Sequence, residues 1–271
     1  MLNAAIVCIG KRENLYIREF VEWYKNLGFS KIYLCDNNVD EYFQDVILDY
    51  IESGFVMLCD CRNRECCQME SYNEVYERFH MYHDWMFFVD IDEFLVLPNH
   101  NNVSEFLSES YFEDAAVIGV NWKIYSDNDL LLYEDKPVNE RFTTPCEENL
   151  TKKYDFPEND HVKIFVKTFF SEIYFFDPHR INVTHMHTST GEMIEADFHY
   201  PHDFSNAYLK HFITKSIGEY IQNKIKRGYP DWNTIKAQSL LTFDNFFIFN
   251  KKNEKKLKII ENYLKYRYIF I

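Results

Sequence analysis

Hydrophobic and polar residues alternate in short blocks through the first 95 residues of the chain. Four of the apolar blocks are short and rich in branched and aromatic residues, which is typical of buried strands. Between them, apolar residues recur at helical spacing, which predicts amphipathic helices. The predicted strands cover residues 4–9, 31–35, 54–58 and 85–89, and the predicted helices cover residues 16–27, 42–51 and 69–83. This alternating order with short connections predicts an α/β fold with a mostly parallel sheet, covered by helices and joined by right-handed crossovers.

After Pro98 the pattern changes to a β-rich stretch that ends in helices. The pattern predicts a helix at residues 103–107, strands at residues 115–122, 162–170, 174–176 and 181–187, and a polar loop over residues 126–160. Apolar residues at helical spacing then predict helices at residues 206–227, 231–249 and 253–268. We therefore expect an α/β domain over residues 1–203 and a helical region over residues 204–271 that packs on it.

Composition narrows the function classes. Hydrophobic residues make up 46% of the 271 positions, which is ample for a sizeable core. The net charge of -14 argues against general nucleic-acid binding, although a phosphate ligand needs only a local field or a metal. Four of the seven cysteines cluster at residues 59–67 in a spacing that fits no common zinc pattern, so we expect reduced thiols.

The ends of the chain bear on its location. No charged-then-apolar leader begins the sequence, and it holds no apolar run of about 18 residues, so we expect a cytoplasmic protein. Residues 253–268 form a basic amphipathic segment that could touch an anionic membrane surface at the inner face of the membrane. A helix packed on the body of the protein is the alternative, and we favour it.

Polar clusters follow all four strands of the predicted parallel sheet. They are residues 11–14, 36–38, 60–64 and 90–93. Ligands of such sheets bind outside the carboxyl ends of the strands, so these clusters should line one edge. The first cluster has neither a G-x-G-x-x-G fingerprint nor a Walker lysine, which argues against dinucleotide-binding and P-loop folds.

The chain is organised around the stretch from Asp84 to Leu95, in which a buried strand runs into Asp90, Asp92 and Glu93. On an extended chain, Asp90 and Asp92 face the same way. Burying two uncompensated carboxylates is costly, and a cation is one remedy. Oxygen ligands without nearby His or Cys suit Mg²⁺ or Mn²⁺ that holds a substrate phosphate. For a D-x-D motif alone, acids that cap a helix or face water are the commoner case.

Several motifs, in the correct order, resemble GT-A-fold glycosyltransferases of the family-2-like and family-92 (DUF23-type) branch. The stretch Asp84-Trp85 to Leu95 resembles that family's D-W-x-x-x-x-D-x-D-E-F-L almost residue for residue. Looser matches are Lys11-Arg12-Glu13, Glu19 to Tyr24, Tyr33 to Asn38, Gln68 with Tyr72-Asn73, Trp122 to Ser126, Lys163 with Lys167, Pro178-His179, Leu209 to Ser216, and Lys224 with Arg227-Gly228. The resemblance covers about residues 3–230. It departs at Arg12, where Asn is usual, and at Asp127, where Ser is common.

The resemblance implies a donor and metal site. Asp92 would bind the ion directly, and Asp90 would bind it through water or hold the ribose. His211 would be a further ligand and would favour Mn²⁺ over Mg²⁺. Lys215, one helical turn on, would meet the diphosphate. Glu13 and Asp36 would face base and ribose, with Lys11 and Asn73 toward the donor. For the donor-binding residues and His211, ordinary surface or packed residues are the alternative.

The resemblance also implies a general base for an inverting transfer. We rank Asp127 first, because it follows the predicted strand that ends at Trp122. Asp129, Glu192 and Asp197 are the other candidates. The histidines between residues 179 and 202 are dense for one region and could position acceptor or metal, or be packed within strands.

The implied function is metal-dependent transfer of a sugar, from a UDP-linked or other nucleotide donor, to a glycan or glycolipid acceptor. The resemblance, together with the expected cytoplasmic location and the Tyr-, Phe-, Asn- and Lys-rich composition, implies bacterial surface polysaccharide or lipopolysaccharide assembly. One alternative is a nucleotidyltransferase, which should show a Gly-rich loop with Arg and Lys after the first strand. Gly10-Lys11-Arg12 is too short a match to such a loop. The other is a non-catalytic nucleotide-sugar-binding module, against which the presence of both Asp90 and Asp92 argues.

Overall fold

The computed structural model describes residues 2–146, 158–169, 172–183, 185–194, 198–227 and 242–266. Strands are β1 Ala4–Gly10, β2 Lys31–Asp36, β3 Val56–Asp60, β4 Trp85–Phe88, β5 Glu93–Val96, β6 Val117–Ile124, β7 Val162–Lys167, β8 Phe175–Asp177, β9 Arg180–Ile181, β10 Met186–Thr188, β11 Met193–Ile194 and β12 Tyr208–His211. Helices are α1 Ile17–Asn26, α2 Gln44–Glu52, α3 Gln68–Phe79, α4 Val103–Leu107, α5 Val138–Arg141, α6 Ile217–Tyr220, α8 Phe243–Phe249 and α9 Glu254–Tyr266. Short 3₁₀ turns lie at His80–Tyr82, Ser110–Phe112 and Glu158–Asp160, and the π-helical turn η5 is Ile221–Ile225.

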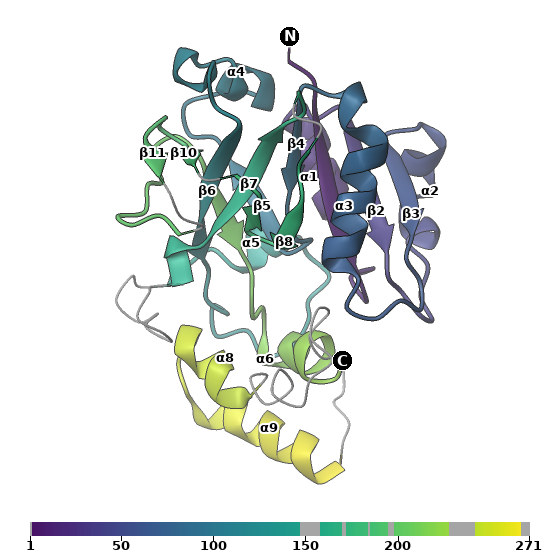
Figure 1. Ribbon diagram of the computed structural model, residues 1–271. Helices are drawn as coiled ribbons and strands as arrows, with labels where there is room; N and C mark the ends of the chain where they lie inside the picture. Colours follow the sequence, from purple (N-terminus) through teal and green to yellow (C-terminus); the bar gives the residue numbers. More distant parts are fainter. Residues whose placement is uncertain are drawn as a thin grey trace.

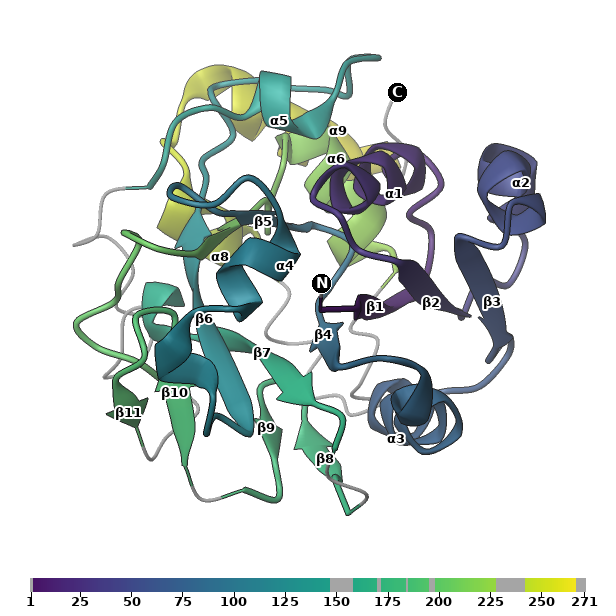
Figure 2. The same cartoon turned by 90° about the horizontal axis from the view of Figure 1, so that it is seen from above.

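The first half of the chain builds a parallel sheet in the order β3-β2-β1-β4. Helices α1 and α2 lie on one face and α3 on the other, as the view along the strands shows (Figure 2). This arrangement confirms the predicted α/β fold. The four predicted strands and three predicted helices of this half all form within a few residues of their expected bounds.

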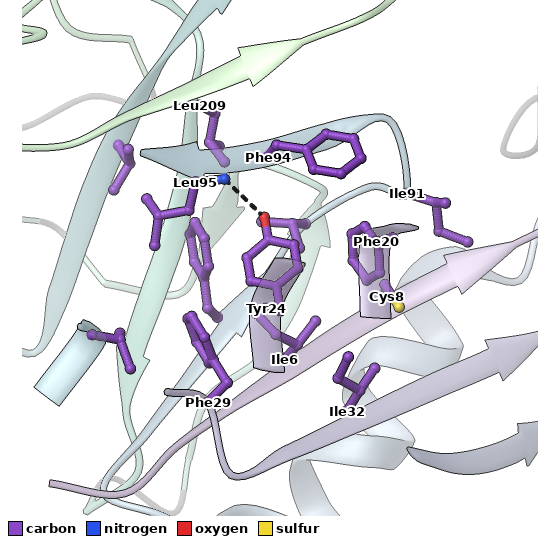
Figure 3. Close-up of a cluster of buried hydrophobic side chains, with 14 of the residues drawn as sticks. Ile6, Cys8, Phe20, Tyr24, Phe29, Ile32, Ile91, Phe94, Leu95 and Leu209 are labelled. Carbon is purple, nitrogen blue, oxygen red and sulfur yellow. Dashed lines mark hydrogen bonds between the residues drawn. The ribbon is translucent and has the colours of Figure 1, made fainter. Parts of the chain in front are cut away.

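The parallel sheet is covered on both faces by packed side chains, so β1 is apolar at almost every position. Ile6 and Cys8 point to the core beneath α1, while Ala5 and Val7 point to the core beneath α3. In the first core, the Tyr24 hydroxyl donates to the carbonyl of Glu93 at 2.9 Å. It also accepts from the N–H of Leu95 at 3.2 Å, as Figure 3 shows. This buried tyrosine thus fixes the chain directly after Asp92.

The second half extends the sheet with strands in mixed antiparallel and parallel pairings. Strand β7 lies between β4 and β6 and is antiparallel to both. Strand β10 continues the sheet beside β6, and β11 forms its edge. Strand β12 pairs with β5 and β6 on a branch of the same sheet. The predicted strands at residues 115–122 and 162–170 are confirmed as β6 and β7, and the predicted helix at residues 103–107 is α4.

The helix predicted over residues 206–227 is wrong in its first part. Tyr208–His211 is a strand, and helical structure begins only at Ile217 after a cap in which Ser216 and Glu219 bond each other's backbone. Leu209 is fully buried between its neighbours, so sheet pairing overrides the local helical pattern. Residues 208–211 therefore belong to the sheet, beyond the boundary expected at residue 203. The helix expected at residues 231–249 is described only from residue 242 onward, where α8 forms.

The C-terminal helices α8 and α9 lie below the sheet, at the end opposite the N-terminus (Figure 1). Ile260 and Tyr263 of α9 pack with Phe246 of α8 and with α6. No helix within the described ranges is long and apolar enough to span a membrane. All seven cysteines are free thiols, as expected.

Candidate active site

A cleft of about 210 Å³ opens where β1 and β4 end. Its lining includes five residues that the sequence singled out as donor or metal ligands: Lys11, Glu13, Asp90, Asp92 and His211. Gly10 ends β1 here, and a Cβ at this position would come within 2.5 Å of the Ile91 side chain. Glycine therefore lets the segment between the two aspartates pass close to β1.

Asp92 is buried and meets two residues from the second half of the chain. Its Oδ2 accepts a hydrogen bond from Lys224 Nζ at 3.1 Å, and its Oδ1 lies 3.7 Å from His211 Nε2. Burial raises the pKa of Asp92, but Lys224, Lys215 and His211 outweigh that effect and hold the pKa well below its usual value. Asp92 is therefore an anion at neutral pH.

His211 is buried beside Asp92, and burial lowers its pKa to about 4 even though Asp92 opposes the shift. The imidazole is therefore neutral at pH 7, the form that binds metals. Its Nδ1 is buried and has no hydrogen-bond partner among the described residues. The ring of Trp122 packs against it at 4.3 Å between centroids.

Asp90 has different partners from Asp92. Its carboxylate accepts from Lys163 Nζ at 2.8 Å and from Gln68 Nε2 at 3.2 Å. Behind it, Glu93 is fully buried and accepts the Asp90 backbone N–H at 2.9 Å. Burial raises the pKa of Glu93 well above its usual value, although Lys163 opposes the shift. This edge of the sheet thus presents two aspartates with a lysine bound to each.

Two further acids at this edge of the sheet, Glu13 and Asp36, also form ion pairs with arginines. Glu13 Oε1 accepts from Arg227 at 2.6 Å, and the same guanidinium bonds the carbonyl of Lys11 at 3.1 Å. Asp36 pairs with Arg62 at 3.1 Å and is turned away from the cleft, which its neighbour Asn37 lines instead. The cleft is therefore a site of alternating charge, suited to an anionic ligand with a cation.

The model for glycosyltransferase family 92 matches residues 4–262. The chain belongs to glycosyltransferase family 92. No curated protein matches the sequence. The family predicted from the sequence motifs is thereby confirmed, and the protein is a glycosyltransferase.

Solved structures similar to this glycosyltransferase are remote. S. aureus TarS, residues 1–349, is 11% identical over 62% of this chain and 47% of its own, with a TM-score of 0.40. GalNAc-T7 with UDP, GalNAc and Mn²⁺ is 11% identical over 62% and 35%, with a TM-score of 0.35. Mannosyl-3-phosphoglycerate synthase from Rubrobacter xylanophilus is 10% identical over 62% and 53%, with a TM-score of 0.33. The chain spans about half or less of these structures, and the family assignment does not depend on them.

The glycosyltransferase family implies a divalent cation, and the cleft can be tested for it. Asp92 and His211 converge, and a carboxylate with a neutral imidazole is a donor set that Mn²⁺ accepts. Over the described ranges, no three His, Cys, Asp or Glu side chains meet at one point. The residues therefore fit an ion held by two protein ligands, with diphosphate oxygens and water in the other positions, as is usual for such ions on phosphates.

The structure does not bring every predicted residue of this glycosyltransferase to the cleft. Asp127 lines a separate hollow beside α8, where its carboxylate lies 2.6 Å from the buried Lys256. Asp129 binds the same lysine at 2.8 Å. The chain turns away after β6 because the Asp127 N–H donates to the side chain of Asn250. Asp127 is therefore poorly placed to act on a sugar in this cleft, which corrects our first choice of base.

Two other predicted donor residues have structural partners. The Asn73 side chain bonds the backbone of Phe175 at 2.8 and 3.2 Å and so anchors β8 to α3. Lys215 follows His211 in an irregular segment, with φ of +53°, and not one turn along a helix. Its ammonium lies 4.3 Å from the ring centroid of Tyr16 and acts on Asp92 through its charge. Asp197, another candidate base, lies outside the described residues.

Four functional candidates of this glycosyltransferase carry no strong signal in the sequence: Lys163, Lys224, Arg227 and His179. All four line the cleft. Lys163 lies within the apolar strand β7, and a charged residue among buried apolar ones is a sequence signal for a functional position. Like Lys163, the other three match the family's motifs only loosely, and nothing local in the sequence shows what they face.

Proposed function

We propose that the protein transfers a sugar from a nucleotide-sugar donor, UDP-linked, to a glycan or glycolipid acceptor, with a divalent metal and with inversion. The observation that carries the proposal is the cleft itself. Asp92 and His211 offer two metal ligands, and Lys11, Lys163, Lys224 and Arg227 offer positive charge to a diphosphate. Membership of a glycosyltransferase family supports the same reaction. A bound Mn²⁺ or Mg²⁺ would stabilise the charge of the departing diphosphate.

His179 is the residue that we propose for the acceptor proton. Its Nδ1 lies 2.7 Å from the carbonyl of Val162, so Nδ1 carries the hydrogen and Nε2 keeps its lone pair. Burial, with Lys163 and His161, lowers its pKa well below the usual value, so the ring is neutral at pH 7. In the transfer, the acceptor oxygen bonds to the anomeric carbon as the bond to the diphosphate breaks. The acceptor proton passes to His179 Nε2, and the electron pair leaves with the diphosphate.

The remaining donor contacts follow the same proposal. Glu13 and Asn37, at the ends of β1 and β2, would hold the nucleoside, with Lys11 beside the phosphates. A lipid-linked acceptor would meet the enzyme at an anionic membrane surface. Support for that comes from the exposed lysines at residues 251, 252, 255, 258 and 265, on and before α9. We also propose that the enzyme acts in the cytoplasm, in the assembly of surface polysaccharide or lipopolysaccharide.

The test is a screen of UDP-sugars for release of UDP, with Mn²⁺ and with a chelator. We expect metal-dependent release that falls by about 100-fold or more in Asp92→Asn, because the metal contributes several kcal/mol to charge stabilisation. Asp84→Asn is the matched control. It lies at the other end of β4, where it accepts the Asn3 N–H at 2.7 Å.

Two results would contradict the proposal. Turnover that is independent of metal and unchanged in Asp92→Asn would remove the metal site. UDP binding without turnover of any donor would favour the non-catalytic binding module.

A further inference from the structure

One short segment after β12 places two cations over the cleft. Lys224, in the π-helical turn η5, binds Asp92 at 3.1 Å, and Arg227, three residues later, binds Glu13 at 2.6 Å. The two acids come from the ends of different strands. The carboxylate that Lys224 occupies is also the one that converges with His211 on the proposed metal site.

A lysine ammonium and a divalent cation compete for this carboxylate. With Lys224 bound, the Asp92 charge is already neutralised. A metal ion that arrives alone would lie against the ammonium, and two cations within a few ångströms in a buried site repel strongly. A diphosphate changes this balance, because its oxygens bind a metal and an ammonium together.

Lys224 is free to move in a way that Lys163 is not. The Lys224 side chain is 20% exposed and reaches the cleft on a flexible four-carbon stem, whereas Lys163 is 1% exposed and bonded to Asp90 beside Glu93. Lys224 also stands in a π-helical turn, a distortion that is frequent at functional sites. The Asp92 pair is therefore the one that a ligand can exchange.

We propose that Lys224 is an exchangeable counter-ion of the metal site. It neutralises Asp92 while the cleft is free, and it transfers to the diphosphate when metal and nucleotide bind together. The inference rests on the proposed function, since it takes the ligand to be a nucleoside diphosphate with a divalent ion. Its consequence is ordered binding, because the metal alone is disfavoured until the diphosphate accepts the ammonium.

The test is Mn²⁺ binding and UDP binding measured separately on Lys224→Met, by calorimetry or by the spectrum of free Mn²⁺. We expect Mn²⁺ alone to bind about tenfold more tightly than to wild type, because its competitor is gone. We expect UDP at saturating Mn²⁺ to bind about tenfold more weakly, because one charge-assisted hydrogen bond is lost. The two shifts have opposite signs, which a merely structural lysine would not produce.

Lys226→Met is the matched control, since Lys226 is exposed on the same turn and bonds Gln222 at 2.8 Å. It should change neither affinity. Lys224→Gln serves as a second variant if the Met variant does not fold, with the same two shifts expected. If the Mn²⁺ and UDP affinities shift in the same direction, or do not shift, the inference is overturned. Mn²⁺-dependent UDP binding by wild type would in that case still support the proposed function. Absence of such binding in wild type overturns both.

Discussion

The acids and the cations of the cleft come from different halves of the chain. Glu13, Asp90 and Asp92 end strands β1 and β4 of the parallel half, whereas Lys163, Lys224 and Arg227 come from β7 and from the segment after β12. The partners are 73, 132 and 214 residues apart in sequence. Each ion pair therefore closes only when the two halves have folded together.

The two halves contribute different properties to the cleft. The parallel half fixes the acids rigidly, because each follows a buried strand whose register is set on both sides. The second half supplies the cleft residues that we propose act on the ligand: the Lys224 ammonium, the neutral rings of His211 and His179, and the guanidinium of Arg227. If this division holds, substitutions at the catalytic groups of the second half should change the reaction more than the stability.

The largest expected effect is on chemistry in the second half. His179→Gln should lower the rate of sugar transfer by about 100- to 10,000-fold, the usual contribution of a general base, while UDP affinity changes by less than about twofold. His187→Gln, on strand β10, is the control. The measurement is kcat for transfer beside the dissociation constant of UDP.

The pH profile sharpens this prediction. A base acts in its neutral form, and burial lowers the pKa of His179 well below 6.5. Transfer by wild type should therefore stay constant as the pH falls to 6.5 and decline only at distinctly lower pH. An acid limb centred near pH 7, or an unchanged kcat in His179→Gln, would assign the proton to another group.

The elements of the parallel half could be predicted from the sequence, whereas the partners that the second half supplies could not. Strands β1 to β4 and helices α1 to α3 were predictable because their apolar periodicity is local and unbroken. Asp90 and Asp92 were predictable at the cleft because they directly follow the buried strand β4, although they lie in the turn between β4 and β5 and contact different partners. Their lysine partners were not, since no local pattern states which distant residue a charged side chain will meet.

The errors have specific physical causes. The helix predicted over residues 206–227 is replaced at Tyr208–His211 by a strand whose backbone pairs with β5 and β6, so tertiary pairing overrides a weak local preference. Asp127 follows β6 as expected, yet its N–H donates to the side chain of Asn250, 123 residues later, and its carboxylate meets Lys256. Both outcomes depend on contacts that form only in the folded chain.

A smaller effect is expected at a buried ion pair of the second half, away from the cleft, that Tyr16 of the parallel half also contacts. Arg141 of α5 binds Glu219 of α6 through three hydrogen bonds of 2.9–3.0 Å, and the Tyr16 hydroxyl donates to the same carboxylate at 2.8 Å. Both partners of the ion pair are buried. Arg141→Met should lower the free energy of unfolding by about 3–5 kcal/mol, because Glu219 is left as an uncompensated buried charge.

The matched control for the Arg141–Glu219 pair is Arg18→Met, which removes an exposed ion pair. Arg18 pairs with Asp49 at 2.8 Å on the exposed surface between α1 and α2, so its loss should cost less than about 1 kcal/mol. Urea unfolding of both variants measures the difference. Equal costs would mean that burial of the Arg141–Glu219 pair adds nothing to its contribution to stability.

The smallest effect is a pH dependence that belongs to the parallel half alone. His83 lies at the opposite end of β4 from Asp90, where its Nε2 is 2.9 Å from the Tyr33 hydroxyl and its Nδ1 is 3.1 Å from Asn3 Oδ1. Burial, aided by Lys31 and opposed by Asp84, lowers its pKa to about 4. The unfolded chain therefore binds a proton near pH 6.5 that the folded chain binds only near pH 4.

Because the unfolded state holds more protons in this window, stability falls as the pH decreases from 6.5 toward 4. The site is only half-buried, so solvent screening reduces the loss to about 1 kcal/mol. Urea unfolding at pH 7 and pH 4.5 should show this loss in wild type, and a loss smaller by that amount in His83→Gln, which cannot take up the proton. Equal losses in the two proteins would place the acid sensitivity elsewhere, in the buried histidines of the second half.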